Sequence, residues 1–292
     1  MKCTKGIILA GGTGSRLFPL TISVNKQLMP VYDKPAIYYP LSTLMLAGIK
    51  DILIISSPAD IEAMKTLLDD GEHFGLSIQY KIQEKPSGLP EAFILGEDFI
   101  QKQPVAMILG DNLFYGHGLS ALLFDSASDV TNAHVFLYRV KDPSLYGVAK
   151  FGANNSDVLD VVEKPSAYVS PWAVTGLYYF PADVSKRAKE LKPSARGELE
   201  ITDLIREYIL EGRINAQKLT RGNVWFDVGS PDALLHASNF VEVLQNRQDI
   251  LISSPEEVAW RVNLITTKQY KTLIEAMPKC TYRKSLELTL EP

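Results

Sequence analysis

Short runs of hydrophobic residues recur along the chain, and turn residues bound each of them. Runs of this length that contain many β-branched residues are typical of strands buried on both faces of a sheet. They predict core strands at residues 6–10, 51–56, 77–82, 105–109, 134–140 and 175–180, with two further strands at 158–163 and 214–219.

Segments with a helical spacing of hydrophobic residues lie between these strands. One begins after Pro35 and stops near Gly48, and others cover residues 199–209 and 233–244. Glycine directly after a helical pattern is a common helix stop. The alternation predicts a Rossmann-like α/β fold, with a mostly parallel mixed sheet flanked by helices.

The pattern changes after residue 253. Helical segments at 256–262, 268–277 and 282–290 follow one another there without a strand-like run. We therefore expect an α/β domain over residues 1–253 and a small helical appendage over 254–292. The appendage is too small to be a separate enzyme, so it either regulates, contacts another subunit or simply caps the core.

Composition excludes several classes of protein. Among 292 residues the formal net charge is -4, so no global basic field favours nucleic acid as a partner. No uninterrupted apolar stretch approaches the length of a transmembrane helix, and we expect no membrane partner. The two cysteines, Cys3 and Cys280, form no CxxC or Cys/His cluster. With no targeting segment recognised at the start, these features favour a reducing cytoplasm.

The most informative segment follows the first predicted strand. It has glycines at positions 11, 12 and 14, then Arg16, and ten residues later Lys26. Glycines let backbone N–H groups approach a polyphosphate, and two cations can neutralise charge on a transferred phosphorus. This combination predicts phosphoryl chemistry on a nucleotide.

The glycine spacing excludes two familiar nucleotide-binding loops. It does not match GxxxxGK[ST], the loop of P-loop kinases and ATPases. It does not match GxGxxG either, and the strand at 51–56 lacks a following acidic residue that would hold a ribose. A nicotinamide-dependent dehydrogenase is therefore disfavoured.

Two aspartates are candidate metal ligands. Asp111 follows the strand at 105–109, at the carboxyl end where open α/β sheets bind ligands, and Asp227 interrupts the apolar run at 224–229. Two carboxylates together with phosphate oxygens suit Mg²⁺. Alternatively, Asp111 caps a turn and Asp227 lies on an edge strand.

These motifs occur together in a known order. The glycine loop with KQLMPV at 26–31, and LGDN, YGV, EKP, VTGLY and KPSARGELEITD further on, resembles the sugar-1-phosphate nucleotidyltransferases. The run YDKPAIYYPLSTLMLAGI at 32–49 is similar to the branch that transfers thymidylyl groups. The likeness covers essentially the whole chain and implies the GT-A-like variant of the fold.

The resemblance implies Mg²⁺-dependent transfer from dTTP to glucose 1-phosphate, giving dTDP-glucose and pyrophosphate. It further implies a homotetramer under allosteric control, on the route to dTDP-L-rhamnose, related deoxysugars and polysaccharides. A uridylyltransferase that makes UDP-glucose is the nearest alternative. A non-catalytic nucleotide-sensing subunit is another, although the joint presence of Arg16, Lys26, Asp111, Lys164 and Asp227 argues against it.

Site residues carry over by the same resemblance. Arg16 and Lys26 are the implied catalytic residues, and Asp111 and Asp227 the implied metal ligands. The implied nucleotide contacts are Leu9, Gly11, Gly12, Thr13, Gly14, Arg16, Lys26, Gln27, Gln83, Pro86, Gly88, Leu89 and Asp111. The implied sugar-phosphate contacts are Asn112, Tyr146, Gly147, Glu163, Lys164 and Val174. The implied regulatory residues are Tyr115, Gly116, His117, Arg221, Gly222, Glu257 and Arg261.

The chain departs from the family in the implied base-recognition segment. The amide of Gln83 can pair with a pyrimidine by one donor and one acceptor, without distinguishing thymine from uracil. Residues 83–92 are QEKPSGLPEA, where the family usually has Gln-x-x-Pro-x-Gly-Leu-Ala-Gln-Ala. Gln83, Gly88 and Leu89 are retained, which preserves pyrimidine recognition, while the finer shape of the loop stays open.

Overall fold

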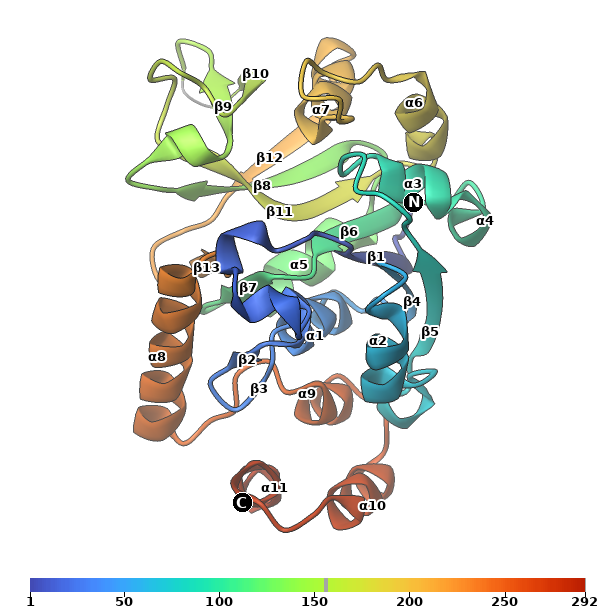
Figure 1. Cartoon of the computed structure of the whole chain (residues 1–292), viewed down its shortest axis with the longest axis vertical. Coiled ribbons are helices and arrows are strands. Elements are labelled where there is room, and N and C mark those ends of the chain that lie inside the picture. The colour runs from blue at the N-terminus through green and yellow to red at the C-terminus, as the bar shows by residue number, and fades with distance from the viewer. Residues whose placement is uncertain (155–156, 292) are drawn as a thin grey trace.

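A nine-stranded mixed sheet forms the centre of the computed structural model, which describes residues 1–154 and 157–291 (Figure 1). Its main order is β10-β9-β11-β6-β1-β4-β5, with β8 pairing β11 and β12. The strands are β1 (Lys5–Ala10), β4 (Asp51–Ser56), β5 (Ser77–Ile82), β6 (Val105–Leu109), β8 (Ala133–Arg139), β9 (Gly147–Phe151), β10 (Val158–Glu163), β11 (Trp172–Phe180) and β12 (Ile214–Lys218).

The strands β5, β4, β1 and β6 are parallel neighbours in that order. In register, Leu9 of β1 lies beside Ile55 of β4 on one side and Leu109 of β6 on the other. The carboxyl ends of these strands therefore meet at one edge of the sheet. Strands β8, β9, β10 and β11 form the other half, in which β11 runs antiparallel to β6, β8 and β9.

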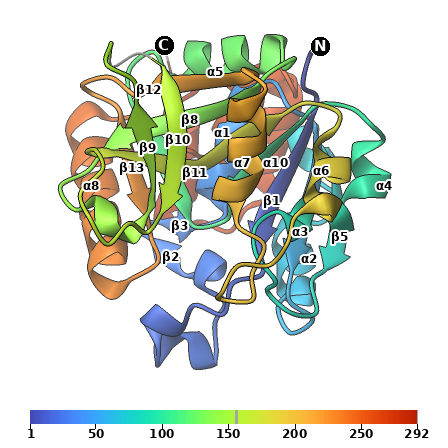
Figure 2. The same cartoon turned by 90° about the horizontal axis from the view of Figure 1, so that it is seen from above.

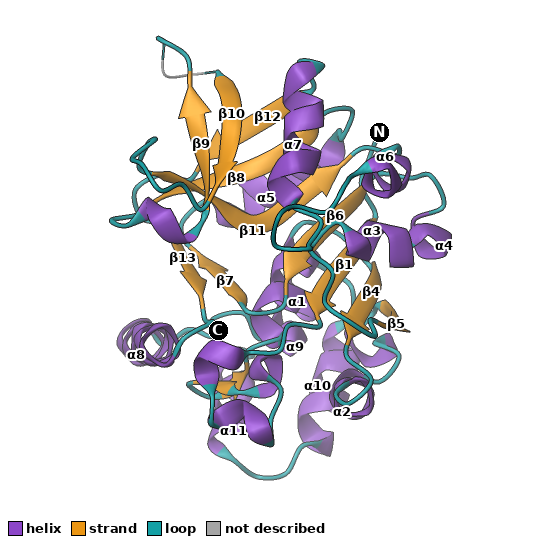
Figure 3. Cartoon of the chain, turned by 45° about the horizontal axis from the view of Figure 1, so that its top comes forward, coloured by secondary structure: helices purple, strands orange, loops and turns teal. Residues whose placement is uncertain are grey.

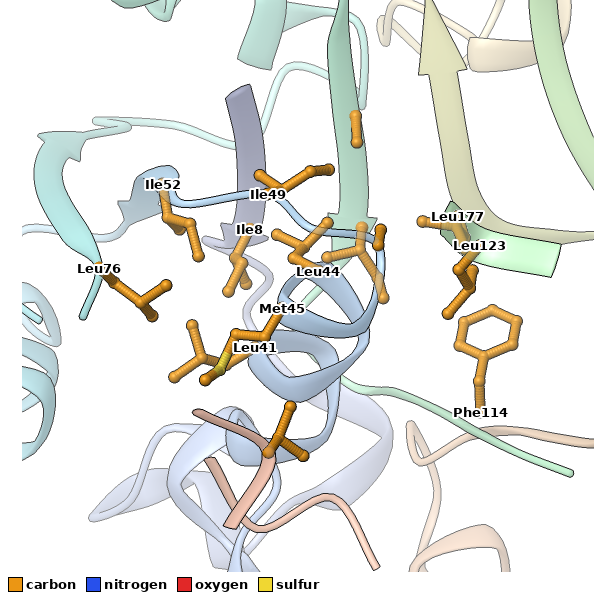
Figure 4. Close-up of a cluster of buried hydrophobic side chains, with 14 of the residues drawn as sticks. Ile8, Leu41, Leu44, Met45, Ile49, Ile52, Leu76, Phe114, Leu123 and Leu177 are labelled. Atoms are coloured by element: carbon orange, nitrogen blue, oxygen red, sulfur yellow. The ribbon is translucent and has the colours of Figure 1, made fainter. Parts of the chain in front are cut away.

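Successive side chains of β1 belong to two different hydrophobic cores, one on each face of the sheet. Ile8 belongs to one buried cluster, and Ile7 and Leu9 belong to the other, because successive side chains of a strand point to opposite faces. The helices α1 (Tyr38–Leu46), α2 (Ile61–Leu68) and α5 (Leu119–Ser128) cover the Ile8 face. Figure 4 shows Leu41, Leu44 and Met45 of α1 within this cluster.

A second group of helices covers the opposite face. These are α3 (Glu91–Leu95), α4 (Glu97–Ile100), α6 (Val184–Glu190) and α7 (Ile201–Leu210). Buried residues of α7 recur at helical spacing, including Leu204, Ile205 and Tyr208. This amphipathic spacing explains why the pattern at 199–209 predicted a helix correctly.

Two small ribbons and a long helix adjoin the sheet. The ribbons pair β2 (Pro30–Val31) with β3 (Lys34–Pro35) and β7 (Asn112–Tyr115) with β13 (Val224–Asp227). The helix α8 (Pro231–Gln248) packs against β2 and β13, and the three share a third buried cluster with β7. Its first turn begins with Pro231 and is capped by Ser230, whose side chain accepts a hydrogen bond from the backbone N–H of Ala233.

The chain ends in the three predicted helices, α9 (Pro255–Arg261), α10 (Thr267–Ala276) and α11 (Thr281–Leu288). Figures 1 and 3 place them at the opposite end of the molecule from β9 and β10. Helix α9 packs against α1. A buried lysine, Lys34, supports this end, because its ammonium contacts Asp33 and Gln245 and lies over the rings of Tyr39 and Tyr282.

Every core strand expected from the hydrophobic runs is present, with ends shifted by at most three residues. The short strands β2, β3, β7 and β9 were not predicted, and β13 was raised only as an alternative, the edge strand that could carry Asp227. Strands β2, β3, β7 and β13 are two to four residues long, too short for a periodic pattern to be distinguished from a turn. Within the described ranges, no helix has the length and hydrophobicity needed to span a membrane.

The two cysteines differ in accessibility, which gives a direct test of the fold. Cys3 is buried, its Sγ donates to the backbone oxygen of Lys5, and burial raises the pKa of its thiol to about 12, whereas Cys280 is exposed. Because the thiolate is the reactive form, we expect DTNB to label one thiol per native chain and two after unfolding. The variant Cys280→Ser should show no rapid native labelling. Rapid labelling of two thiols in the native protein would contradict the burial of Cys3.

Candidate active site

Three cavities that share lining residues open at the carboxyl edge of the parallel strands. The largest has a volume of about 570 Å³ and is lined by residues from β1, the glycine loop, and the segments after β5, β6 and β10. A second of about 140 Å³ shares Leu89, Glu163 and Asp227 with it. A third of about 420 Å³ shares Gly12, Lys26 and others. This is where open α/β sheets bind their ligands.

The glycine loop brings backbone close to other groups of the site. Gly14 has φ +61°, and a Cβ there would lie 2.6 Å from Cγ2 of Thr21. A Cβ at Gly11 would overlap the side-chain oxygen of Gln83. The loop therefore depends on glycine for both conformation and space. Figure 2 shows the dark-blue segment that follows it extending away from the sheet.

Lys26 is held by a capped turn. The side chain of Asn25 accepts from the backbone N–H of Gln27 at 2.8 Å and donates to Asp60 at 2.8 Å. This turn aims the Lys26 ammonium at Asp111, with which it forms an ion pair and a hydrogen bond. The Lys26 side chain is only 15% exposed and that of Asp111 only 6%, so the pair is shielded from water.

The β7–β13 ribbon brings the two candidate metal ligands together. Asp227 pairs in register with Asn112, and the backbone N–H of Val228 donates to the backbone oxygen of Asp111 at 2.9 Å. A guanidinium nitrogen of Arg16 lies 3.6 Å from an Asp227 carboxylate oxygen. Two carboxylates and two cations thus converge on one wall of the largest cavity.

Burial and mutual repulsion oppose ionisation of these carboxylates. Burial tends to raise the pKa of Asp111, but the Lys26 ammonium has the larger effect and holds that pKa below its ordinary value. Burial, followed by the neighbouring Asp111 carboxylate, raises the pKa of Asp227 to about 6. Their arrangement suits a divalent cation, which would relieve the repulsion.

The side chains available as ligands limit which metal ion the site could hold. In the described ranges no three His, Cys, Asp or Glu side chains form a cluster that could hold a metal ion. Two carboxylates leave the remaining ligand positions to water and substrate phosphates, which is how Mg²⁺ is usually held. Asp111 and Asp227 are therefore the residues that would hold it.

Gln27 presents a buried acceptor to the site. The side-chain oxygen of Gln27 is buried and, within the residues that the structure describes, accepts no hydrogen bond, although Gln27 lines the largest cavity. An unpaired buried acceptor is costly, so this position calls for a donor from a bound molecule. A sugar hydroxyl is such a donor.

The segment predicted to recognise the base is shaped by Gly88, whose φ is +109°. It forms a parallel bridge with Leu199, and a Cβ on Gly88 would overlap the Leu199 backbone oxygen. The backbone N–H of Leu199 donates to the backbone oxygen of Ser87 at 2.8 Å. Residues near 199 thereby fix the loop that carries Pro86, Gly88 and Leu89.

Polar groups at the far side of the cavities surround the predicted sugar site. Glu163 lies 3.8 Å from the Lys164 ammonium and 3.4 Å from the Arg196 guanidinium. Lys164 has φ +40°, and its backbone N–H donates to the backbone oxygen of Tyr146 at 3.0 Å. Arg196 also pairs with Glu200 at 2.7 Å, so two cations and two carboxylates meet here; the cations can contact a phosphate and the carboxylates can accept from sugar hydroxyls.

Asn112 lines the second cavity and also forms hydrogen bonds with other residues of the protein. Its side-chain oxygen accepts from the Trp225 indole at 2.6 Å and from the Gly176 backbone at 3.1 Å. Its amide nitrogen donates to Asp111 at 3.1 Å. Asn112 therefore orients Asp111 whatever contact it makes with a sugar.

Comparison with known proteins identifies the family. The model of the nucleotidyl transferase family matches residues 5–243, which include both halves of the sheet and all three cavities. The chain belongs to the nucleotidyl transferase family.

Two curated relatives support this family. The glucose-1-phosphate thymidylyltransferase of Neisseria gonorrhoeae is 50% identical over 97% of this chain and 98% of its own length. That of Mycobacterium tuberculosis is 47% identical over 98% of this chain and 99% of its own. Both matches extend over nearly the whole of this chain.

Solved structures show the same fold. A provisionally assigned glucose-1-phosphate thymidylyltransferase from Bacillus anthracis, crystallised with sucrose, has a TM-score of 0.74 and 38% identity, covering 81% of this chain and 94% of its own. A UDP-glucose pyrophosphorylase with UDP-glucose has a TM-score of 0.71 and 26% identity, covering 84% and 100%. The predicted fold class and enzyme class are confirmed.

In this nucleotidyl transferase, nearly all residues predicted for substrate binding line the three cavities. The exception is Gly14, which shapes the loop behind them. The residues that line at least one cavity are Leu9, Gly11, Gly12, Thr13, Arg16, Lys26, Gln27, Gln83, Pro86, Gly88, Leu89, Asp111, Asn112, Tyr146, Gly147, Glu163, Lys164, Val174 and Asp227.

The predicted regulatory residues fall into two groups. Tyr115 ends β7, and the backbone oxygen of His117 accepts from Asn223, which places Gly116 beside the turn containing Arg221 and Gly222. Glu257 and Arg261 form an ion pair on α9, with atoms 3.3 Å apart. No hydrogen bond or ion pair joins the two groups in the part of the chain that the structure describes. Their regulatory role stays a prediction.

Several residues that line the cavities were not predicted from the sequence. The most informative are Arg196, Thr202 and Trp225. Arg196 and Thr202 lie in the motif at 192–203 that carried the family resemblance, which is the signal that could have found them. Trp225 lies on β13, within the apolar run at 224–229 that was noted only for Asp227.

Proposed function

We propose that this protein transfers the thymidylyl group of dTTP to glucose 1-phosphate, releasing pyrophosphate and forming dTDP-glucose. The names of the relatives support the substrates. The observation that carries the proposal is the convergence of Lys26, Arg16, Asp111 and Asp227 on one cavity.

The proposed reaction is a displacement at phosphorus. An oxygen of the glucose 1-phosphate anion attacks the α-phosphorus of dTTP and forms a new P–O bond. The bond from that phosphorus to the bridging oxygen breaks, and its electron pair leaves with pyrophosphate. The nucleophile is already an anion at neutral pH, so positioning and charge neutralisation provide most of the catalysis.

Each part of the site has a role in this proposal. Backbone amides of the glycine loop and Arg16 hold the triphosphate, while Lys26 stabilises charge that develops on the transferred phosphate. Gln27 accepts a hydrogen bond from the deoxyribose, and Gln83 with Gly88 binds the base. The sugar phosphate occupies the second cavity, lined by Asn112, Tyr146, Gly147, Glu163 and Val174, with Lys164 and Arg196 on the adjoining wall of the largest cavity.

The proposed cofactor is Mg²⁺ held by Asp111 and Asp227. When bound, it would supply positive charge to phosphate oxygens and position them for displacement. Without it the two buried carboxylates repel one another, which is the physical reason for expecting a cation here.

A pyrophosphate-release assay tests the proposal. With glucose 1-phosphate as acceptor, we expect turnover with dTTP and with UTP and none with ATP or GTP, because Gln83 pairs with a thymine or uracil edge. Purine nucleotide use would contradict the assignment of Gln83. Absence of pyrophosphate release with every nucleotide would favour a non-catalytic nucleotide-sensing subunit.

Uridylyl transfer is the second candidate, supported by the structural likeness to a UDP-glucose pyrophosphorylase. Thymine and uracil present the same hydrogen-bonding edge, so the choice depends on how the site treats a 2′-hydroxyl. A ratio of kcat/KM for UTP over dTTP above one would favour this alternative.

We further propose that the protein acts on the route to dTDP-L-rhamnose and related deoxysugars, as a homotetramer under feedback control. The proposed regulatory residues lie at the end of β7, in the segments after β7 and before β13, and on α9. The helical segment from residue 254 onward would then contact subunits or the regulator. Sedimentation velocity and inhibition by dTDP-L-rhamnose are the measurements that test this.

A further inference from the structure

The side chain of Gln83 is held in one orientation by a single strong contact. Gln83 directly follows β5 and is only 4% exposed. Its amide nitrogen donates to the Oε2 atom of Glu91 at 2.6 Å. In the described chain, the Gln83 side-chain oxygen has no protein donor, and the residue lines two of the cavities. One amide hydrogen and the carbonyl oxygen are thus left for a ligand.

Glu91 is itself fixed by the backbone. It is the first residue of α3, and the next two residues, Ala92 and Phe93, are fully buried in the core. The same Oε2 atom also accepts from the backbone N–H of Ser87 at 3.2 Å. A backbone N–H cannot become an acceptor, so the atom that faces Ser87 must be an acceptor. That acceptor in turn requires Gln83 to present its nitrogen.

We infer that Glu91 is a positioning residue that makes Gln83 selective for thymine and uracil over cytosine. The inference rests on the proposed function, in which Gln83 binds the base. Thymine and uracil present an N3–H donor beside a carbonyl acceptor, and the free Gln83 oxygen and N–H match this pair. Cytosine presents the reverse, an N3 acceptor beside an amino donor.

Binding cytosine at the same place would require the Gln83 amide to rotate by half a turn. Rotation would direct the Gln83 oxygen at the Glu91 carboxylate, which has no proton to donate when ionised. A buried contact between two acceptors is strongly unfavourable, so cytosine would be rejected. Discrimination therefore arises from a residue that need not touch the base.

The position differs from the usual family pattern, which has glutamine where this chain has Glu91. A glutamine can also supply an acceptor oxygen, and the Ser87 N–H would select that rotamer. The charge of Glu91 is thus not required, whereas the acceptor is. Replacing Glu91 by glutamine therefore keeps the hydrogen bond to Gln83 and removes only the negative charge near the nucleotide.

Three variants test the inference. Glu91→Met removes the acceptor at similar volume, Glu91→Gln keeps an acceptor without charge, and Asp98→Leu is a control that removes an exposed acid of α4. The measurement is kcat/KM for dTTP and for dCTP with glucose 1-phosphate, together with KM for glucose 1-phosphate and the melting temperature. Glu91→Ala repeats the first test if Glu91→Met is unstable.

We expect Glu91→Met to lower the dTTP:dCTP ratio of kcat/KM by about 10-fold or more, the effect of one buried hydrogen bond. Glu91→Gln and Asp98→Leu should keep the ratio within about threefold of the unmodified protein. KM for glucose 1-phosphate should stay unchanged, because Glu91 does not line the cavities assigned to the sugar.

Other outcomes would overturn the inference. An unchanged ratio in folded Glu91→Met, or an equal loss in Glu91→Gln, would show that Glu91 does not act as an acceptor for Gln83. The unmodified protein tests the proposed function separately. If it fails to use dTTP, the proposed function fails before any variant is compared.

Discussion

Replacing Lys26 by alanine is expected to lower kcat by roughly 10²–10³, the loss typical of removing one charge-stabilising group from a transition state. The ammonium lies against the buried Asp111 carboxylate and lines the largest cavity. In such a shielded place a fixed cation stabilises developing negative charge far more than it would in water. Steady-state kinetics with saturating dTTP and glucose 1-phosphate measure the effect.

The control for this experiment is Lys65→Ala. Lys65 lies on α2 and pairs with Glu62 at the surface, so its loss should leave kcat unchanged. Because removing Lys26 also leaves Asp111 without its partner, the melting temperature of each variant must be recorded. Near-normal turnover by folded, saturated Lys26→Ala protein would refute the catalytic role of Lys26.

The second large effect is expected for Asp111→Asn. The amide keeps the shape of the carboxylate but cannot hold a divalent cation as strongly, and it cannot form an ion pair with Lys26. We expect kcat to fall by about 10²-fold or more, because a metal ion contributes several kcal/mol to phosphoryl transfer. Residual activity should no longer rise with Mg²⁺ concentration.

The matched control is Asp125→Asn, which changes an exposed aspartate of α5. It should retain both kcat and the dependence on Mg²⁺. If Asp111→Asn responds to Mg²⁺ in the same way as the unmodified protein, Asp111 is not a metal ligand. If higher Mg²⁺ restored the activity, the expected loss of Mg²⁺ dependence would be wrong, and Asp111 would strengthen metal binding without being essential for it.

Much of the active site could be predicted because its residues follow core strands. Gln83 comes directly after β5, Asp111 follows β6 with one residue between them, and the glycine loop comes after β1. Strands buried on both faces have a strong hydrophobic signal, and parallel strands present their carboxyl ends at one edge. The sequence therefore indicated these residues and their common location.

Residues contributed by short or irregular segments were harder to predict. Arg196 lies in a loop between α6 and α7, where no periodic pattern describes the backbone. Trp225 lies on β13, which pairs with β7, a strand more than 100 residues earlier in the chain. Such pairing depends on long-range contacts that a local window of sequence does not contain.

The sequence by itself determined the layers of the fold, the nucleotide-binding loop and the chemical class of the site, because hydrophobic spacing and glycine positions are local properties. Only the tertiary structure decided how separate segments act together. It set Asp227 beside Asp111 by pairing β13 with β7, and it directed the Gln83 amide by placing Glu91 against it. Both outcomes depend on distances and orientations of side chains, which arise only once the elements have packed.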